Sequence, residues 1–167
     1  IKLANFVVNN AIDDTRWTYT TDVDHSYVDN YHTGGVIDEI LETMEHLHDW
    51  RWKSTLLKAV QYYEQYLFTN EGAPKNRNNR KYPYDIHGAA QGIITFSKIS
   101  RLEPAYMTLA EKIFDWTINN LYSGKGYFYY QKMRFYTKKF MFMRWCNAWM
   151  LYALGELLSA KTRLRQI

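Results

Sequence analysis

The chain has a single cysteine, three prolines and no long apolar run. Its one cysteine, Cys146, excludes an internal disulfide framework and offers no thiolate metal site. It lies in the apolar stretch RWCNAWMLYAL, which predicts a small buried side chain. No stretch approaches the ~20 apolar residues that a membrane-spanning helix needs, so no membrane span is expected.

The remaining composition is that of one folded domain. The 167 residues are 47% hydrophobic and 17% aromatic, which excludes a disordered chain and suffices for one core. Fifteen Tyr and six Trp combine apolar area with polar tips, a property that suits half-wet concave surfaces as well as cores. Sugars bind to such surfaces, and so do proteins.

Positive charge is concentrated in the second part of the chain. Residues 1–70 contain 5 Lys+Arg and 11 Asp+Glu, whereas residues 71–167 contain 16 and 6. A basic region of this kind can attract nucleic acid or an anionic polymer. The alternative is an ordinary solvated surface whose acidic counterpart lies elsewhere in the molecule.

A repeat of about 56 residues organises the chain. Asp29 and Asp85 align at this offset, and each precedes a histidine, small residues and an apolar stretch, YHTGGVIDEIL and IHGAAQGIITF. RWCNAWMLYAL lies roughly the same distance further on. These stretches, which begin near residues 33, 87 and 145, are apolar or small around most of a helix. They predict three inner helices that are buried on nearly all sides.

Amphipathic outer helices are expected between the inner ones. One apolar stripe runs through residues 51–68 and another through 104–121, where Pro104 suits the first turn. Residues 3–12 resemble the second stripe, so the chain is expected to start within an outer helix. The alternation predicts an all-α fold of helical hairpins forming part of an (α/α)6-type toroid, with an open solenoid as the alternative. Residues 1–167 are expected to be a single domain, a fragment of about three hairpins.

Five stretches carry a resemblance to a known family: YVDNYHTGGVIDEIL, RKYPYDIHGAAQGI, IFDWTINNL, KGYFYYQK and MRWCNAWMLYAL. Together they resemble the C-terminal part of a bacterial six-hairpin (α/α toroid) glycosidase-like family of polysaccharide biosynthesis loci. Its relatives include unsaturated glucuronyl hydrolases and N-acylglucosamine 2-epimerases. The resemblance implies a carbohydrate-active protein whose full-length relatives are about twice as long. Some members carry the name delta-aminolevulinic acid dehydratase, a barrel enzyme whose strand–helix alternation this sequence lacks.

Asp29 with His32, and Asp85 with His87, are the candidate catalytic residues. Glycosidic hydrolysis needs an acid that protonates the leaving oxygen and a second group that activates water. Epimerisation needs a base that removes a carbon-bound proton and an acid that returns one, often histidine. We expect Asp85 to transfer the proton and the other three to support it. The alternative is that both aspartates are only helix N-caps, each worth about 1 kcal/mol.

Tyr82, Gln91, Arg144, Trp145 and Trp149 are the candidate substrate-binding residues. Trp145 and Trp149 are four residues apart and share a helix face, on which a sugar ring can stack. Arg144 can hold a carboxylate through two hydrogen bonds, or it neutralises a buried acid of the protein. Gln91 lies one helical turn after a candidate histidine, so a polar line is expected to face the toroid axis. Such a line needs partners from the protein or from a ligand.

Two further motifs are expected to be structural. The small residues at 88–92 lack the spacing of a phosphate-binding loop and are expected to allow close helix packing. His46 and His48 are two residues apart and do not share a helix face, so no metal site is expected. No cofactor is expected either.

The tract KGYFYYQKMRFYTKKF, residues 125–140, mixes cations with aromatic rings. It predicts an aromatic loop or short hairpin that closes the top of the toroid, and stacking on single-stranded nucleic acid is the alternative. Its cations can attract an acidic glycan through Lys132, Arg134, Lys138 and Lys139. We therefore expect an oligosaccharide or polysaccharide partner, acidic glycans included, and no nucleic acid.

The leading hypothesis is a glycoside hydrolase-like protein that acts on or binds bacterial surface polysaccharide. A sugar epimerase and a non-catalytic helical scaffold are the alternatives. A homodimer is a further expectation, because part of a toroid exposes apolar flanks. A cytoplasmic location is expected, with the periplasm as the alternative.

Overall fold

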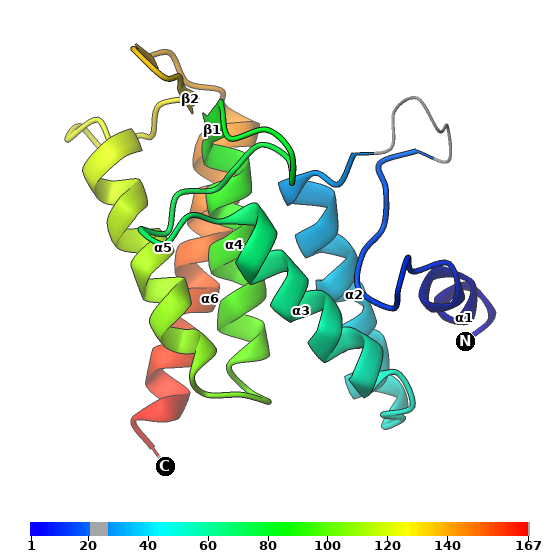
Figure 1. Ribbon diagram of the computed structural model, residues 1–167. Coiled ribbons are helices and arrows are strands. Elements are labelled where there is room, and N and C mark those ends of the chain that lie inside the picture. Colours follow the sequence, from blue (N-terminus) through cyan, green and yellow to red (C-terminus); the bar gives the residue numbers. More distant parts are fainter. Residues whose placement is uncertain (21–26, 167) are drawn as a thin grey trace.

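The computed structural model describes residues 1–20 and 27–166 (Figure 1). The helices are α1 (Lys2–Asn9), α2 (Asn30–Leu47), α3 (Lys53–Leu67), α4 (Ile86–Ile99), α5 (Tyr106–Leu121) and α6 (Trp149–Leu164), and a π-helical segment, Met143–Ala148, leads into α6. Three short strands lie between the helices. Strand β1 (Tyr84–Asp85) directly precedes α4, and β2 (Gln131–Lys132) and β3 (Thr137–Lys138) lie between α5 and the π-helical segment. No helix in the described ranges is both long and apolar enough to cross a membrane.

Helices α2, α4 and α6 form an inner layer, and α3 and α5 pack outside it. Helix α4 packs against α2, α5 and α6, and Figure 1 shows the N-terminal ends of α2, α4 and α6 at the same end of the molecule. Every residue of α4 except His87 is buried. The open position of the central helix therefore lies at its N-terminal end, beside the starts of its two neighbours.

The outer helices follow the apolar stripes of the sequence. Helix α3 buries the predicted stripe in full, which consists of Leu56, Ala59, Val60, Tyr63 and Leu67. Helix α5 begins at Tyr106, so the prediction that Pro104 lies in its first turn is wrong by two residues. The Pro104 carbonyl instead accepts a hydrogen bond from the Met107 N–H in the turn that leads into the helix.

The expected burial on nearly all sides is confirmed for α4 and is wrong for α2 and α6. Helix α2 leaves His32, Glu39 and His46 exposed. Helix α6 buries one stripe, Met150, Ala153, Leu157 and Ala160, while Leu151 and Leu158 are 72% and 67% exposed. The difference arises because α4 has neighbours on three sides, whereas α6 packs mainly against α4 and the π-helical segment. An apolar sequence thus predicts what a helix can bury and not how many neighbours it has.

The three strands form an antiparallel sheet in the order β1-β2-β3. In its register Asp85 pairs with Gln131, and Gln131 pairs with Lys138. The strands β2 and β3 confirm the short hairpin predicted within residues 125–140. The sheet fixes this hairpin to the residues that directly precede α4.

Small residues allow α4 to pack closely against its neighbours in both layers. A Cβ added to Gly92 would lie 2.4 Å from the Phe68 Cζ, and one added to Gly34 would lie 2.5 Å from the Gln91 Cγ. Neither distance is compatible with an ordinary contact. The packing role predicted for the small residues at 88–92 is confirmed, since Gly88, Ala89, Ala90 and Gly92 are all buried.

Candidate functional site

A cavity of about 290 Å³ lies at the N-terminal ends of the inner helices. It is lined by the start of α2, the loop at residues 74–77, the start of α4 and Trp145. The four candidate catalytic residues all line it, together with one candidate binding residue: Asp29, His32, Asp85, His87 and Trp145. The 56-residue repeat therefore brings its two acid–histidine pairs to one place.

Asp29 and His32 form a hydrogen-bonded pair on α2. Asp29 is the N-cap of the helix, and its Oδ2 accepts from the His32 N–H at 3.3 Å and contacts the His32 Nδ1 at 2.7 Å. The Asp29 side chain is 17% exposed and the His32 side chain is 57% exposed. In neutral His32, a carboxylate at Nδ1 holds the proton there, so Nε2 keeps a free lone pair. This geometry suits a proton acceptor.

Asp85 is held by both of its carboxylate oxygens. Its Oδ1 caps α4 by accepting from the His87 N–H at 2.9 Å, and its Oδ2 accepts from the Gln131 Nε2 at 2.6 Å. The Gln131 Oε1 in turn accepts from the Lys138 Nζ at 2.9 Å. Burial raises the pKa of Asp85, and these two hydrogen bonds and the Lys138 charge oppose that shift. A carboxyl with a raised pKa is suited to proton donation.

His87 lies within a group of aromatic rings from all three inner helices. Tyr31 stacks on it with ring centroids 3.5 Å apart, and Trp145 and Trp149 meet it edge-on at 4.7 and 5.4 Å. Burial lowers the pKa of His87 to about 4, and the nearby His32 contributes in the same direction. The imidazole of His87 is therefore neutral at physiological pH.

The loop after α3 supplies two cations to the cavity. Val28 and Asn78 exchange hydrogen bonds, and Asp29 forms a β-bridge with Arg77, so this loop runs beside the start of α2. The Arg77 guanidinium lies over the Tyr27 ring, 3.5 Å from its centroid. Burial lowers the pKa of Lys75, which also lines the cavity. Neither cation pairs with a carboxylate of the described residues.

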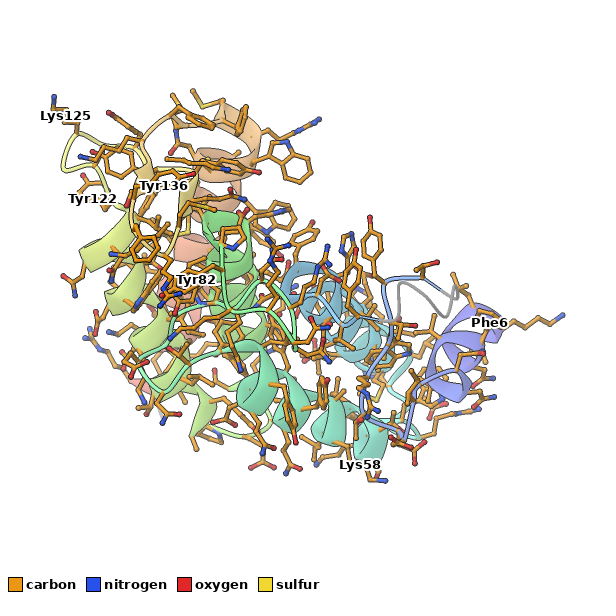
Figure 2. The ribbon with its side chains drawn as sticks, turned by 45° about the horizontal axis from the view of Figure 1, so that its top comes forward. Phe6, Lys58, Tyr82, Tyr122, Lys125 and Tyr136 are labelled. Carbon is orange, nitrogen blue, oxygen red and sulfur yellow. The ribbon has the colours of Figure 1, made fainter. Side chains whose placement is uncertain are left out.

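The other candidate binding residues lie outside this cavity. Tyr82 packs against Tyr84 with ring centroids 4.8 Å apart, beside α4 in Figure 2. Arg144 is exposed and lies over the Trp145 ring at 5.4 Å, and the partners of Asp85 given above do not include it. Trp149 contacts the His87 ring edge-on and lines a second cavity.

Gln91 also lines the second cavity, and its partners come from the protein. Its Nε2 donates to the Asp38 Oδ2 at 2.9 Å and to the Thr95 Oγ1 at 3.1 Å. Gln91 is buried, one turn after His87, so the polar line predicted on α4 exists and continues to α2.

Two residues that line the cavity, Tyr31 and Arg77, and one that holds Asp85 from outside it, Gln131, are not predicted from the sequence. Tyr31 lies 56 residues before His87, so these two residues are equivalent in the repeat. The repeat could therefore have identified Tyr31 as a residue of the site. Residue type alone pairs His32 with His87 instead, because each is a histidine that follows an aspartate. Gln131 and Arg77 offered no such signal, because they reach the aspartates through strand pairing across 46 and 48 residues.

The cavity brings together side chains that can donate and accept protons. It contains a histidine with an oriented imidazole, a carboxyl with a raised pKa and several aromatic faces. Within residues 1–20 and 27–166, no group of three or more His, Cys, Asp or Glu side chains is placed to hold a metal ion.

Comparison with known proteins gives matches in structure. No family model matches the sequence, and no curated protein matches it. Cellobiose 2-epimerase from Spirochaeta thermophila superposes with a TM-score of 0.75 at 15% identity, over 97% of this chain and 46% of that one. Unsaturated glucuronyl hydrolase from Bacillus sp. GL1 gives 0.72 at 12% identity, over 93% and 47%. A D-mannose isomerase gives 0.73 at 14% identity, over 96% and 44%.

These similarities show the fold. The solved structures are (α/α)6 toroids, so the predicted all-α architecture of toroid hairpins is confirmed. The chain spans about half the length of the solved structures that it matches.

Proposed function

We propose that the chain is part of a carbohydrate-active protein that transfers protons at the cavity between the inner helix starts. The observation that carries the proposal is the convergence of the Asp29–His32 pair with Asp85 in one cavity. The cavity wall includes aromatic faces, on which sugar rings stack. The fold supports the proposal, because the three solved structures named above are all carbohydrate enzymes.

In a glycoside hydrolase-like reaction the two halves of the cavity have separate roles. Asp85 is the proton donor to the leaving oxygen, since burial raises its pKa and so favours the protonated carboxyl. His32 is the base that activates water, since Asp29 holds the proton of its imidazole on Nδ1. Trp145 offers an exposed ring on which the sugar stacks.

A sugar epimerase is the alternative that one observation favours. His32 and His87 line the same cavity, and the nearness of His32 contributes to the lowered pKa of His87. Two imidazoles on one substrate can remove a carbon-bound proton and return one to the opposite face. The pKa of His87, lowered by burial to about 4, makes this imidazole a weak base.

We propose that the substrate is an acidic glycan, of the kind found in bacterial surface polysaccharides. Lys75 and Arg77 face the cavity without a carboxylate partner among the described residues. Residues 122–144 add further cations and carry no Asp or Glu. An anionic sugar is attracted to such a surface.

A non-catalytic scaffold that forms a homodimer is the second candidate function. Leu151 and Leu158 on α6 are exposed, as are Leu3 and Phe6 on α1. Figure 2 shows Phe6 pointing away from the body of the molecule. Exposed apolar side chains of this kind mark interaction surfaces. Light scattering on the protein and a Leu151→Glu variant tests this candidate, and a monomeric parent contradicts it.

Turnover of defined oligosaccharides tests the enzymatic proposal. The purified protein is incubated in heavy water with neutral and uronic acid-containing oligosaccharides, and products are followed by NMR. New reducing ends indicate hydrolysis, whereas deuterium on a sugar carbon indicates epimerisation. We expect Asp85→Asn and His32→Asn to lower kcat/KM by about 100-fold or more.

Two matched variants control for loss of folding. Asp115→Asn on α5 and His46→Asn on α2 change exposed side chains of the same types, and we expect them to retain full activity. If the parent converts no oligosaccharide, or if Asp85→Asn is as active as Asp115→Asn, the enzymatic proposal is wrong.

A further inference from the structure

The hairpin of β2 and β3 and the segment that follows it form an exposed apolar surface. Residues 134–136, in the turn of the hairpin, and residues 139–144, after β3, are all exposed. Phe135 is 86% exposed and Met143 is 68% exposed. We call these two stretches the hairpin surface. Consecutive large apolar side chains in contact with water indicate an interaction surface.

Backbone hydrogen bonds hold the hairpin surface in place. The Tyr130 N–H donates to the Phe140 carbonyl at 3.0 Å, and the Cys146 N–H donates to the Phe142 carbonyl at 2.8 Å. Tyr130 directly precedes β2, and Cys146 is a buried residue of the π-helical segment. The apolar side chains are therefore presented by a backbone that is fixed to the sheet and to the start of α6.

The hairpin surface protrudes from the end of the molecule at which the inner helices begin. In Figure 1 the hairpin extends beyond the N-terminal ends of α4 and α6, and Figure 2 shows Tyr136 at the same end. Neither of the two cavities that contain the candidate site residues includes a residue of the hairpin surface. A protruding surface of this kind suits a broad partner rather than a small ligand.

The charged side chains of the hairpin surface are all positive. They are Arg134, Lys139 and Arg144, and none of the three pairs with a carboxylate in the described part of the chain. Residues 122–144 contain no Asp or Glu. Charge complementarity therefore requires an anionic partner.

The apolar part of the hairpin surface is not a platform for stacking. Met141 and Met143 have no ring, and the Phe140 and Phe142 rings pack edge-on against each other with centroids 5.5 Å apart. Tyr130 contacts both of these rings, at 5.5 and 5.0 Å. Nucleic-acid bases and sugars stack on open aromatic faces, so neither accounts for this run of Phe and Met side chains.

A second copy of the chain also fits the hairpin surface poorly. In a two-fold symmetric contact a surface meets itself. The three cations of one copy would then face the same three cations of the other, without an acidic residue between them. Like charges placed opposite each other disfavour a contact.

We propose that the hairpin surface docks the protein on a membrane that contains anionic phospholipids. Phe135 and the Phe and Met side chains of residues 140–143 enter the boundary between headgroups and acyl chains, where apolar and aromatic side chains are favoured. The three cations stay at the level of the lipid phosphates. Trp145, the next residue along the chain, lines the first cavity, so docking brings this cavity close to the membrane. The inference does not depend on the proposed function.

Sedimentation with lipid vesicles tests this inference. One vesicle contains phosphatidylcholine alone, and the other contains equal parts of phosphatidylcholine and phosphatidylglycerol. Each Lys or Arg near an anionic membrane strengthens binding about fivefold, so the three cations are expected to favour the anionic vesicle about 100-fold. Concentrated salt screens these charges and is expected to remove most of the preference.

Two pairs of variants locate the contact. Phe135→Ala is expected to weaken binding to the anionic vesicle about 10-fold, because it removes an inserted ring. Phe6→Ala removes a 64% exposed ring that lies far from the hairpin in Figure 2, and is expected to leave binding unchanged. Lys139→Gln is expected to weaken binding about fivefold, and Lys53→Gln, at an exposed lysine of α3, is its matched control. Thermal unfolding verifies that each variant is folded.

Three results would show that the inference is wrong. The parent sediments with neither vesicle, it sediments equally with both, or Phe135→Ala binds the anionic vesicle as well as Phe6→Ala does. Light scattering and binding of a single-stranded oligonucleotide then identify the other partner: a dimer that Phe135→Ala dissociates indicates a second copy, and weaker oligonucleotide binding by this variant indicates nucleic acid. Turnover of oligosaccharides in solution needs no vesicle, so the proposed function survives each of these results.

Discussion

Replacing Gly34 by alanine tests how closely α2 and α4 approach. The added Cβ would lie 2.5 Å from the Gln91 Cγ, 2.7 Å from the Tyr63 hydroxyl and 3.0 Å from the Thr95 Oγ1. All three neighbours are buried. The Tyr63 hydroxyl donates to the Asn30 Oδ1 at 3.0 Å, and Gln91 bonds to α2. A methyl group cannot be accommodated there unless two or more of these side chains move.

The expected magnitude follows from opposing terms. Overpacking a tight core site destabilises by about 1–3 kcal/mol. Displacing the Tyr63 hydroxyl from Asn30 adds about 1 kcal/mol. Alanine in a helix interior is favoured over glycine by about 0.5–1 kcal/mol. We therefore expect Gly34→Ala to lower the free energy of unfolding by about 1–3 kcal/mol.

The same substitution at Gly155 is the control. Gly155 lies within α6, and no atom is within 4 Å of a Cβ added there. Only the helix term remains, so we expect Gly155→Ala to raise the free energy of unfolding by about 0.5–1 kcal/mol. Urea unfolding of the parent and both variants measures these changes, provided that the m-value is constant. A Gly34→Ala variant as stable as the parent would refute the close crossing of α2 and α4.

Three further predictions concern ionisable groups of the two cavities. His87 is expected to stay neutral to about pH 4 in an NMR titration, and Trp145→Ala to raise its pKa toward 6.5 by admitting water; a parent pKa near 6.5 contradicts this. The raised pKa of Asp38, about 7 in the folded state against 3.8 otherwise, gives stability that is present below pH 4 and lost as the pH rises through 7. The free energy of unfolding of Asp38→Asn is therefore expected to rise relative to that of the parent between pH 4 and pH 8. If urea unfolding gives the same difference between the two proteins at every pH, this prediction is wrong. Asp85→Ala is expected to lose about 1 kcal/mol of stability because the N-cap is lost, whereas Asp85→Asn keeps the cap; equal losses contradict this.

Much of the helical framework could be predicted from the sequence. The stripe of α3 and the small residues of α4 are local signals, because helical periodicity and side-chain size depend on neighbours along the chain. Asp29 and Asp85 were found for the same reason, since an N-cap acts on backbone groups two or three residues away.

The contacts that shape the candidate site are long-range and could not be predicted. Gln131 reaches Asp85 because β2 pairs with β1, and Asp38 meets Gln91 because α2 crosses α4. Neither contact has a periodic signal in the sequence. The one-sided burial of α6 was missed for a related reason: the number of neighbours of a helix is a property of the whole fold.

Capping and a role in the site are compatible at these aspartates, although the sequence presented them as alternatives. Asp85 uses Oδ1 to cap α4 and Oδ2 to accept from Gln131, so the cap fixes the orientation of the carboxyl within the cavity. Asp29 uses one oxygen for both the His32 N–H and the His32 Nδ1. The backbone hydrogen bonds that begin α2 and α4 therefore also orient Asp29 and Asp85, which hold the proposed proton acceptor and provide the proposed proton donor. A site built in this way is as rigid as the inner helices, which is the condition for precise proton transfer.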